Sequence, residues 1–480
     1  MTQRLSNTTH TVRYDRTRLR PRIVHLGLGA FFRAHGAIYT EDVLLEKGGA
    51  QGTADWGIAG VSLRNPDQRD RLTPQDGLYT ALCRDGAGTK ARVVGTVLSA
   101  LVAPENPAAI VARMAHLDTA IVSLTITEKG YCHNPATGRL DPNHPDIVHD
   151  LHHPDTPRTA VGFLAAALRA RRTASQPPFA VLTCDNLPSN GRLLAGLLHD
   201  FAAAQDGTLA TWIRSNVACP ATMVDRIVPA MTGADLRDVE AATGLTDAAP
   251  VSHEPFRQWV IEDRFNGNDR PAWERAGAQI VSDVAPFEHM KLRLLNGAHS
   301  AMAYLGYLSG HETIHDTISD PILHQYTQRL WDEIIPMVPP PPGTDLRAYT
   351  VSLADRFANP TVRHRTWQIA MDGSQKLPQR LLGTIQERLH ANLPIPALAL
   401  AVAAWIRYVG GTDESGAPID VRDPMAAELK SRAAGEEAVG NILEMRKIFP
   451  ADLATNPGFI TPVTEAFHRL RTQGARGAAR

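Results

Sequence analysis

The sequence predicts an α/β protein with a Rossmann-like dinucleotide-binding domain over residues 1–284 and a mostly α-helical domain over residues 285–480. The first observation is length, because 480 residues exceed what one ordinary hydrophobic core organises. The second is a change of pattern. Short β-branched runs alternate with helical stretches until about Ala285, and helical periodicity dominates afterwards. Such alternation is typical of a largely parallel sheet covered by helices.

Five largely apolar runs are the expected strands, as for strands that helices cover on both faces. They are Arg22–Leu26, Trp56–Leu63, Arg92–Val97, Thr119–Thr125 and Phe179–Thr183. In the second domain, the proline-rich run 336–342 predicts a non-helical connection.

Composition and charge exclude several function classes. The chain is 43% hydrophobic and 21% charged with a net charge of −1, and it has no basic stripe for nucleic acid or an anionic membrane. The polar N-terminus lacks the apolar core of a signal peptide, and the most apolar window, Ala397–Val409, is shorter than a membrane span. The four cysteines form no CxxC pair. We therefore expect a cytoplasmic enzyme, monomeric or a small homo-oligomer, with no nucleic-acid or membrane partner.

A candidate cofactor site follows the first expected strand. Ile23–Leu26 runs directly into Gly27 and Gly29, and then into Phe31 and Arg33 at the start of a helical stretch. Glycines let the backbone approach a pyrophosphate, whose charge the helix N-terminus favours. Arg33 is within reach of a phosphate from one turn into the helix. The third glycine of the usual pattern is absent, so an ordinary tight turn is the alternative interpretation.

The end of the second strand bears on the choice between NAD and NADP. Asp67 is placed to bind the ribose hydroxyls of NAD, whereas Arg64 would suit the 2′-phosphate of NADP. The sequence favours NAD without excluding NADP.

A candidate catalytic segment begins the second domain. Lys291, Asn296 and His299 lie at i, i+5 and i+8, which on an α-helix spans an arc of about 140° and roughly 12 Å of axis. Transfer of hydride from an alcohol needs a base such as lysine and donors for an oxyanion. Ordinary helix surfaces also carry these residue types, but Asn296-Gly297 is locally unfavourable in mid-helix, as functional sites often are.

Two other polar clusters lie in the first domain. Thr183–Gly191, which contains Asn186, follows a strand where open α/β sheets place their ligands, although a turn with Asx caps would look the same. Asp225 and Arg226 stand among apolar residues, which also describes a buried ion pair.

A histidine-rich stretch, His144–His153, raises the question of a metal. Prolines at 145 and 154 and the lack of an acid at HExxH spacing favour a solvated loop, so no metal site is expected.

These clusters, in this order, resemble the mannitol dehydrogenase family, the polyol-specific long-chain dehydrogenases. The resemblance extends from Ile23 to about Gly474. Its most specific motif is Lys291-x4-Asn296-x2-His299, preceded by Thr222–Pro229.

The resemblance implies NAD-dependent chemistry without zinc on a small sugar-derived ketone or alcohol. It implies Lys291 as general acid and base, and Asn296 with Asn186 as the oxyanion clamp. It also implies that His299 orients the substrate, that Asp225 lies near the substrate hydroxyls, and that the active site lies in the cleft between the domains.

Within the family, the chain is most similar to the branch that reduces hexuronates at C5. The similarity rests on Thr125–Cys132, Glu254–Asp263 and especially Trp367–Arg380. A uronate carries a carboxylate that a polyol lacks, and Lys376 or Arg380 is suited to pair with it. A solvated helix end is the alternative for these two cations.

Three rival functions remain. The nearest is a mannitol or arabinitol dehydrogenase, for which an uncharged ketose or polyol would be the substrate. A non-catalytic nucleotide sensor would not need the proton donor Lys291. A metal-dependent hydrolase built on the histidine stretch would be inhibited by a strong chelator.

Overall fold

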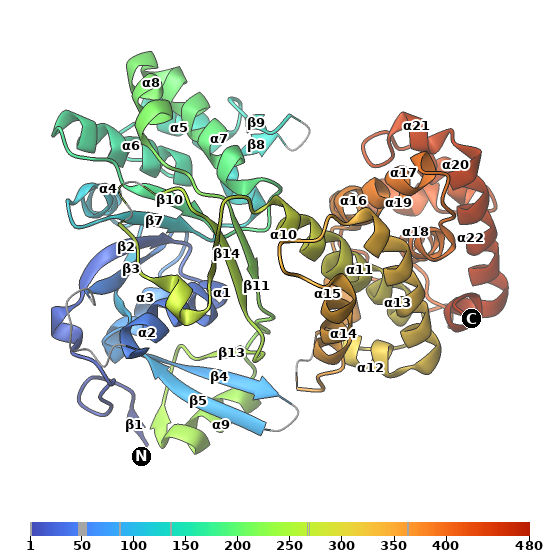
Figure 1. Cartoon of the computed structure of the whole chain (residues 1–480), viewed down its shortest axis with the longest axis horizontal. Coiled ribbons are helices and arrows are strands. Elements are labelled where there is room, and N and C mark those ends of the chain that lie inside the picture. The colour runs from blue at the N-terminus through green and yellow to red at the C-terminus, as the bar shows by residue number, and fades with distance from the viewer. Residues whose placement is uncertain are drawn as a thin grey trace. The chain divides into compact units, whose positions relative to one another are not determined.

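The computed structural model describes residues 2–46, 55–85, 88–134, 137–265, 267, 269–361 and 364–480. The chain divides into two compact units, Met1–Val284 and Ala285–Arg480 (Figure 1). Each unit is described by itself.

A five-stranded parallel sheet forms the centre of the first unit. Its order is β10-β7-β2-β3-β6, with bounds β2 Arg20–Leu26, β3 Trp56–Ser62, β6 Val97–Val102, β7 Ile121–Leu124 and β10 Ala180–Thr183. The strand order reverses between β2 and β7, and in open α/β sheets ligands bind beyond the carboxyl ends of the strands at that point. The predicted Rossmann-like arrangement is confirmed.

Both faces of this sheet are buried, as its apolar strands require. Val24 and Val122 pack with α4 (Pro107–Ala115), α6 (Ala160–Thr173), α7 (Asn190–Gln205) and α8 (Gly207–Asn216). Ile23 and Ile121 point to the opposite face, toward α1 (Ala30–Ala34) and α2 (Gly36–Glu46). Neighbouring strand residues therefore enter different cores, as the two-residue period of a strand demands.

One strand prediction is wrong. Residues 92–97 do not form a strand of the parallel sheet. Arg92 lies in β5 (Gly88–Val94), which pairs antiparallel with β4 (Tyr79–Asp85), and the chain turns at Gly95 before β6. β6 is an edge strand whose residues are mostly half-buried, so its apolar signal is weak.

Two three-stranded sheets that combine antiparallel and parallel pairs, which the sequence analysis did not anticipate, add further strands to the first unit. β14 (Gln258–Glu262) lies between β11 (Thr222–Asp225) and β15 (Gln279–Val281), and β13 (Val251–His253) extends the β4–β5 pair. Two short pairs complete it, β1 (Gln3–Arg4) with β12 (Leu245–Thr246) and β8 (His133–Asn134) with β9 (Arg139–Leu140). The remaining helices are α3 (Asp67–Leu72), α5 (Pro145–His152) and α9 (Gly233–Thr243).

The second unit is helical throughout its described residues apart from its connections, as predicted. The apolar window Ala397–Val409 falls in α18 (Pro396–Val409), which is almost entirely buried and packs against α22 (Pro457–Ala478) and α11 (Ala298–Leu308). The other helices are α10 (Ala285–Met290), α12 (Ile314–Ser319), α13 (Pro321–Ile334), α14 (Leu346–Phe357), α15 (Thr366–Ala370), α16 (Gly373–Leu377), α17 (Gly383–His390), α19 (Ala426–Arg432), α20 (Ala438–Leu443) and α21 (Ala451–Ala454). The proline-rich run passes from a 3₁₀ turn, Ile335–Met337, into a connection that ends at α14.

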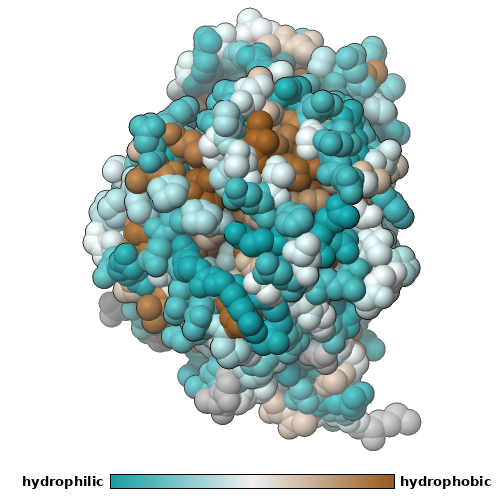
Figure 2. Space-filling view, turned by 90° about the vertical axis from the view of Figure 1, so that its right-hand side faces the viewer, coloured by the Kyte–Doolittle hydropathy of each residue, from teal (hydrophilic) through white to brown (hydrophobic). Residues whose placement is uncertain are grey.

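The surface of the second unit is mixed. Figure 2 shows a face on which hydrophilic side chains predominate and apolar residues gather in the upper half. In the described part of the chain, no helix is both long and apolar enough to cross a membrane.

Candidate functional site

The turn after β2 requires glycine at its first position. Gly27 has a φ of +93°, and a Cβ there would lie 2.0 Å from the Thr125 carbonyl oxygen. The Gly27 carbonyl accepts hydrogen bonds from the Gly29 amide at 2.6 Å and from Thr125 Oγ1 at 2.9 Å. Two neighbouring strands, β2 and the end of β7, thus fix a turn at the place where the strand order reverses.

Gly29 and Phe31 continue this turn into α1. Gly29 is the N-cap of the helix, and beyond its chain neighbours the nearest heavy atom to where its Cβ would be is the Gly27 oxygen at 3.7 Å. Phe31 is half-buried, and its ring stacks on His35 with centroids 5.1 Å apart. The backbone at Gly29 is therefore open to a close ligand approach, the use for which dinucleotide sites keep glycine.

Arg33 does not face a phosphate position. The side chain is only 4% exposed, its guanidinium donates to the Ala249 carbonyl, and it packs over the Tyr79 ring at 5.2 Å. Its role is to join α1 to the segment before β13. Sequence spacing placed it correctly one turn into the helix but could not show the direction of the side chain.

His25 is a residue of this turn that the sequence analysis did not single out. Its Nδ1 lies 2.8 Å from Ser123 Oγ, and its Nε2 lies 2.9 Å from Thr125 Oγ1 and 3.2 Å from the Gly27 oxygen. Burial lowers the His25 pKa to about 3, so the ring is neutral. A polar residue inside an otherwise apolar strand was the available signal.

The residues expected to distinguish NAD from NADP lie beyond the carboxyl end of β3. Asp67 is the first residue of α3 and is exposed, and Arg64 is exposed in the preceding connection. β3 pairs directly with β2, so both residues follow the strand that neighbours the glycine turn. Their positions leave both alternatives open.

The polar cluster that follows β10 contains residues that bind the main chain and one exposed amide side chain. Asp185 accepts hydrogen bonds from the Ile126 and Thr127 amides at 2.9 and 3.0 Å, which joins the ends of β7 and β10. The Asn190 amide group bonds the main chain of Thr222. Asn186 is exposed at the carboxyl edge of the sheet, where ligands bind.

Asp225 ends β11 and is only 4% exposed. The neighbouring Arg226 donates to the Ala34 carbonyl at 2.6 Å and to the Glu254 carbonyl at 3.0 Å. Burial lowers the pKa of Arg226 to about 10. Main-chain oxygens therefore fix this guanidinium next to the start of α2.

The predicted catalytic segment is not an ordinary α-helix. Lys291–Gly297 is a π-helical segment between α10 and α11. Because π-helices form i→i+5 hydrogen bonds, residue i+5 lies above residue i, so Lys291 and Asn296 share one face instead of spreading over the expected arc. π-Bulges occur frequently at functional sites. Lys291 is 6% exposed and Asn296 is half-buried.

A second π-helical segment, Pro378–Leu382, contacts the first. A Cβ at Gly297 would lie 2.9 Å from the Arg380 carbonyl oxygen, so this close approach requires a glycine. The Trp331 indole donates to the Leu294 carbonyl at 2.9 Å and supports the first segment from the side of α13.

Of the two cations predicted for a carboxylate, Arg380 lies on the second π-helical segment and Lys376 lies on α16, directly before it. Arg380 Nη1 donates to Ser300 Oγ at 3.0 Å and lies 3.5 Å from the Asn296 carbonyl oxygen. Lys376 Nζ donates to the Met371 carbonyl at 2.6 Å. Both are half-buried, which distinguishes them from a solvated helix end.

His299 is buried on α11 in a positively charged surrounding. Its Nε2 is a buried atom with no hydrogen-bond partner among the described residues. Burial lowers its pKa well below the usual value, and positive groups lower it further. The charged groups are Arg380, Arg356 and Lys376, and the neighbouring His364 acts in the same direction. The ring is therefore a neutral donor or acceptor within a cationic cluster.

The histidine-rich stretch is not a loop, which corrects the sequence prediction. It contains α5, with Pro145 in the first turn, where a missing amide hydrogen costs nothing. Asp150 ends up buried and accepts hydrogen bonds from the Arg158 and Thr159 amides, both at 2.8 Å. In the part of the chain described, no group of three or more His, Cys, Asp or Glu side chains is placed to bind a metal ion.

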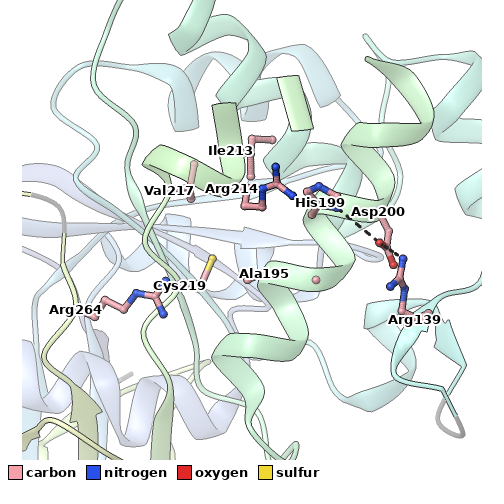
Figure 3. A pocket seen from close by; sticks show the side chains of 10 residues that line it. Arg139, Ala195, His199, Asp200, Ile213, Arg214, Val217, Cys219 and Arg264 are labelled. Atoms are coloured by element: carbon pink, nitrogen blue, oxygen red, sulfur yellow. Dashed lines mark hydrogen bonds and ion pairs between the residues drawn. The ribbon is translucent and has the colours of Figure 1, made fainter. Parts of the chain in front are cut away.

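A separate cavity of about 360 Å³ lies in the first unit (Figure 3). Arg139 and Asp200 form an ion pair of 2.7 Å at its edge. The lining consists of Arg139, Ala195, Gly196, His199, Asp200, Ile213, Arg214, Val217, Cys219 and Arg264. None of the site residues predicted from the sequence, all of which the structure describes, is in that set.

Comparison with known proteins identifies relatives over nearly the whole chain. Family models of the mannitol dehydrogenase Rossmann domain and C-terminal domain match residues 21–275 and 283–471. A D-mannonate oxidoreductase of Escherichia coli is 47% identical and covers 96% of each chain. A mannitol dehydrogenase of Saccharomyces cerevisiae is 40% identical over 96% of this chain and 92% of its own length. Mannitol 2-dehydrogenase of Pseudomonas fluorescens, solved with NAD and D-mannitol, matches with a TM-score of 0.88 at 38% identity, covering 97% of this chain and 95% of its own.

Proposed function

The chain belongs to the mannitol dehydrogenase family of oxidoreductases, and we propose that it interconverts D-fructuronate and D-mannonate with NAD. The observation that carries the choice of substrate is the position of the half-buried Arg380 guanidinium, 3.0 Å from Ser300 Oγ and 3.5 Å from the Asn296 carbonyl oxygen in the second unit. The 47% identity to a D-mannonate oxidoreductase supports the same choice.

A sugar acid and a polyol differ in charge. Lys376, Arg380 and Arg356 are the positive side chains that depress the His299 pKa. A carboxylate that binds near these cations gains a favourable electrostatic interaction. A uronate supplies a carboxylate, for which an arginine offers paired N–H donors. D-Mannitol and D-fructose have no such group.

The residues of the first unit fit a dinucleotide. A side chain at Gly27 would collide with Thr125, and the open backbone at Gly29 stands at the start of α1, beyond the carboxyl end of β2. Gly27, Gly29 and Phe31 are the proposed cofactor contacts, with Asp67 at the adenosine ribose. NAD, when bound, supplies or accepts the hydride at C5 of the sugar.

The protein's own residues manage the proton and the charge. We assign Lys291 as the general acid that protonates the C5 oxygen during reduction and as the base that removes this proton during oxidation. The Asn296 and Asn186 amides donate hydrogen bonds to the oxygen as its negative charge develops. His299 orients the sugar, and Asp225 binds its hydroxyls. The π-turn supports the pairing of Lys291 with Asn296, because it places both on one face.

A polyol 2- or 4-dehydrogenase is the second candidate. The relatives named mannitol dehydrogenase and mannitol 2-dehydrogenase are 40% and 38% identical over almost the whole chain. Lys376 Nζ donates hydrogen bonds to main-chain carbonyls, so part of its capacity to bind a carboxylate is already used. This contact also favours the polyol alternative. A nucleotide sensor without catalysis is less favoured, because it would not need a buried lysine beside an amide.

Product identification tests the proposal. The purified protein is incubated with NADH and D-fructuronate, and the product is identified by NMR. NAD with D-mannonate tests the reverse reaction, and NADPH replaces NADH in a parallel series. We expect D-mannonate with NADH, and D-fructuronate in reverse. Formation of mannitol from D-fructose, without turnover of the uronate, would assign the protein to the polyol branch instead.

A further inference from the structure

A half-buried histidine, His364, faces His299. The ring of His364 meets the His299 ring edge to face, with centroids 4.7 Å apart. His364 Nδ1, like His299 Nε2, is a buried atom that has no hydrogen-bond partner in the part of the chain that the structure describes. Buried polar atoms are nearly always hydrogen-bonded, so two such atoms on touching rings are available to bind a polar group of a ligand.

His364 lies in a connection, yet the main chain fixes its position. Its carbonyl oxygen accepts a hydrogen bond from the Ile314 amide at 2.9 Å, and the next residue, Arg365, forms an antiparallel bridge with Thr313. The Thr366 amide then donates to the Glu312 carbonyl at 3.0 Å. These bonds hold the backbone of His364 against the start of α12, so the position of its imidazole is restricted.

The ring of His299 is also held in place, in its case by aromatic packing. Phe357 stacks on it with centroids 5.2 Å apart, and Trp331 stacks behind Phe357 at 6.5 Å. The Trp331 indole is itself bound to the Leu294 carbonyl of the π-helical segment. Rings placed by packing and by backbone hydrogen bonds are preorganised for a ligand.

The chemistry of the pair indicates what the ligand offers. Burial and the nearby Lys376 ammonium lower the His364 pKa to about 4, so the ring is neutral at physiological pH. A neutral imidazole provides one N–H donor. The charged groups that lower the pKa values of the pair are the cations Arg380, Arg356 and Lys376. An anionic acceptor is therefore the group that both the N–H donors and the cations favour.

We propose that His364 and His299 together bind the carboxylate-bearing end of the substrate, which makes His364 a specificity-determining residue. This inference rests on the proposed hexuronate reaction and goes beyond it by assigning the recognition of the acid group to a histidine pair. Lys376 and Arg380 supply the surrounding positive charge, and the two imidazoles supply directed hydrogen bonds.

Steady-state kinetics of His364 variants test this inference. His364→Leu removes the donor, and His364→Asn keeps an amide nitrogen near the position of Nδ1. Each is assayed with D-fructuronate and with D-fructose. We expect His364→Leu to lower kcat/KM for D-fructuronate about 30-fold, mainly through KM, and to change kcat/KM for D-fructose less than about threefold. His364→Asn is expected to restore most of the loss. Equal losses for both substrates in the leucine variant would overturn the inference.

Controls separate a specific effect from misfolding and from failure of the proposed function. His468→Leu changes an exposed histidine of α22 in the same unit and should leave both substrates unaffected. NADH binding, measured by fluorescence, and the Tm show whether each variant is folded. If His364→Leu does not fold, His364→Asn tests the inference instead. It must retain at least a third of the wild-type ratio of kcat/KM for D-fructuronate to kcat/KM for D-fructose. A wild-type enzyme that prefers D-fructose would contradict the proposed function itself, whereas a uronate-specific wild type with an unselective His364→Leu loss would contradict only the inference.

Discussion

The glycine turn after β2 and the π-helical segment Lys291–Gly297 perform their proposed roles by different means. In the turn, the backbone carries the function: Gly27 adopts a φ that other residues avoid, and Thr125 holds its carbonyl oxygen. In the π-helical segment, side chains carry the function, and the irregular helix brings Lys291 and Asn296 onto one face. A strand followed by glycines is visible in a sequence, whereas a π-turn depends on packing between segments distant in the sequence.

The difference also concerns how the two regions are supported. Side-chain hydrogen bonds from neighbouring strands stabilise the turn, with His25 and Thr125 converging on one carbonyl. The π-helical segment is supported by a second π-helical segment, to which it packs through Gly297. Changes at the turn should therefore weaken nucleotide binding, and changes at the π-helical segment should weaken turnover. The following predictions test this division.

The largest effect is expected for Lys291→Ala. Loss of a general acid and base typically costs about 10²–10⁴-fold in rate, so kcat should fall by that amount. NADH affinity should stay within about twofold, because the proposed nucleotide contacts lie elsewhere. Stopped-flow turnover and fluorescence titration measure the two quantities.

Lys447→Ala is the matched control, since Lys447 is an exposed lysine of the same unit. It should change neither quantity. Near-normal kcat in Lys291→Ala would remove the lysine from the mechanism and, with it, the proposed role of the π-helical segment.

Gly27→Ala should produce the opposite pattern. A Cβ at this position meets the Thr125 oxygen at 2.0 Å, and a left-handed conformation alone costs a non-glycine residue about 1–3 kcal/mol. We expect NADH to bind at least about tenfold more weakly and the Tm to fall. Gly196→Ala, in a helix where the added Cβ meets nothing within 4 Å, should retain NADH affinity. Unchanged affinity in Gly27→Ala would mean that this turn does not bind the nucleotide.

Acid should destabilise both units, because each holds a neutral histidine: His25 beside the glycine turn and His364 against His299. The His25 pKa is lowered to about 3 and the His364 pKa to about 4, from an ordinary value of about 6.5. Between these values the unfolded chain binds more protons than the folded chain, so stability falls as pH decreases through this window and is retained above it.

Calorimetry at pH 7.5, 6.0 and 5.0 measures this dependence. We expect the Tm to fall by roughly 5–10 °C over the series, and by less in His364→Asn, which lacks one of these groups. A Tm that rises toward pH 5 would contradict the neutral, buried state of these rings.

The smallest effect is expected at Ser300. Ser300→Ala removes the hydroxyl that accepts a hydrogen bond from Arg380 at 3.0 Å, so the guanidinium becomes less well placed. One hydrogen bond to a charged group is worth about 1.5–3 kcal/mol, but solvent and the Asn296 carbonyl compensate most of it here. The KM for D-fructuronate should rise about two- to fivefold with kcat unchanged. An equal rise in KM for D-fructose would exclude a role in binding the acid group.

Much of the fold follows from local sequence rules. Apolar runs gave four of the strands of the parallel sheet, and the loss of that alternation near Ala285 indicated the helical second unit. The rule failed for β6, which is an edge strand with half-buried residues and lacks a continuous apolar run. It also failed for α5, where Pro145 was taken as a helix breaker although proline is favoured in the first turn.

The sequence predicted which residues belong to the site but not how their side chains are arranged in space. The order of Gly27, Lys291 and Asn296 in the chain identified where the chemistry should lie. Side-chain direction was not available, so Arg33, which binds the Ala249 carbonyl, was taken for a phosphate ligand. His364 was missed because it lies in a connection, and only its tertiary contact with His299 distinguishes it from other histidines.

The ratio of kcat/KM for D-fructuronate to kcat/KM for D-fructose, measured with the wild-type protein and NADH, tests the central claim most directly. A cationic cluster that binds the carboxylate predicts a ratio of about 100 or more, since a charged hydrogen bond contributes about 1.5–3 kcal/mol and several are proposed here. A ratio near one or below would contradict the claim. It would mean that Arg380, Lys376 and the two histidines serve a substrate without an acid group.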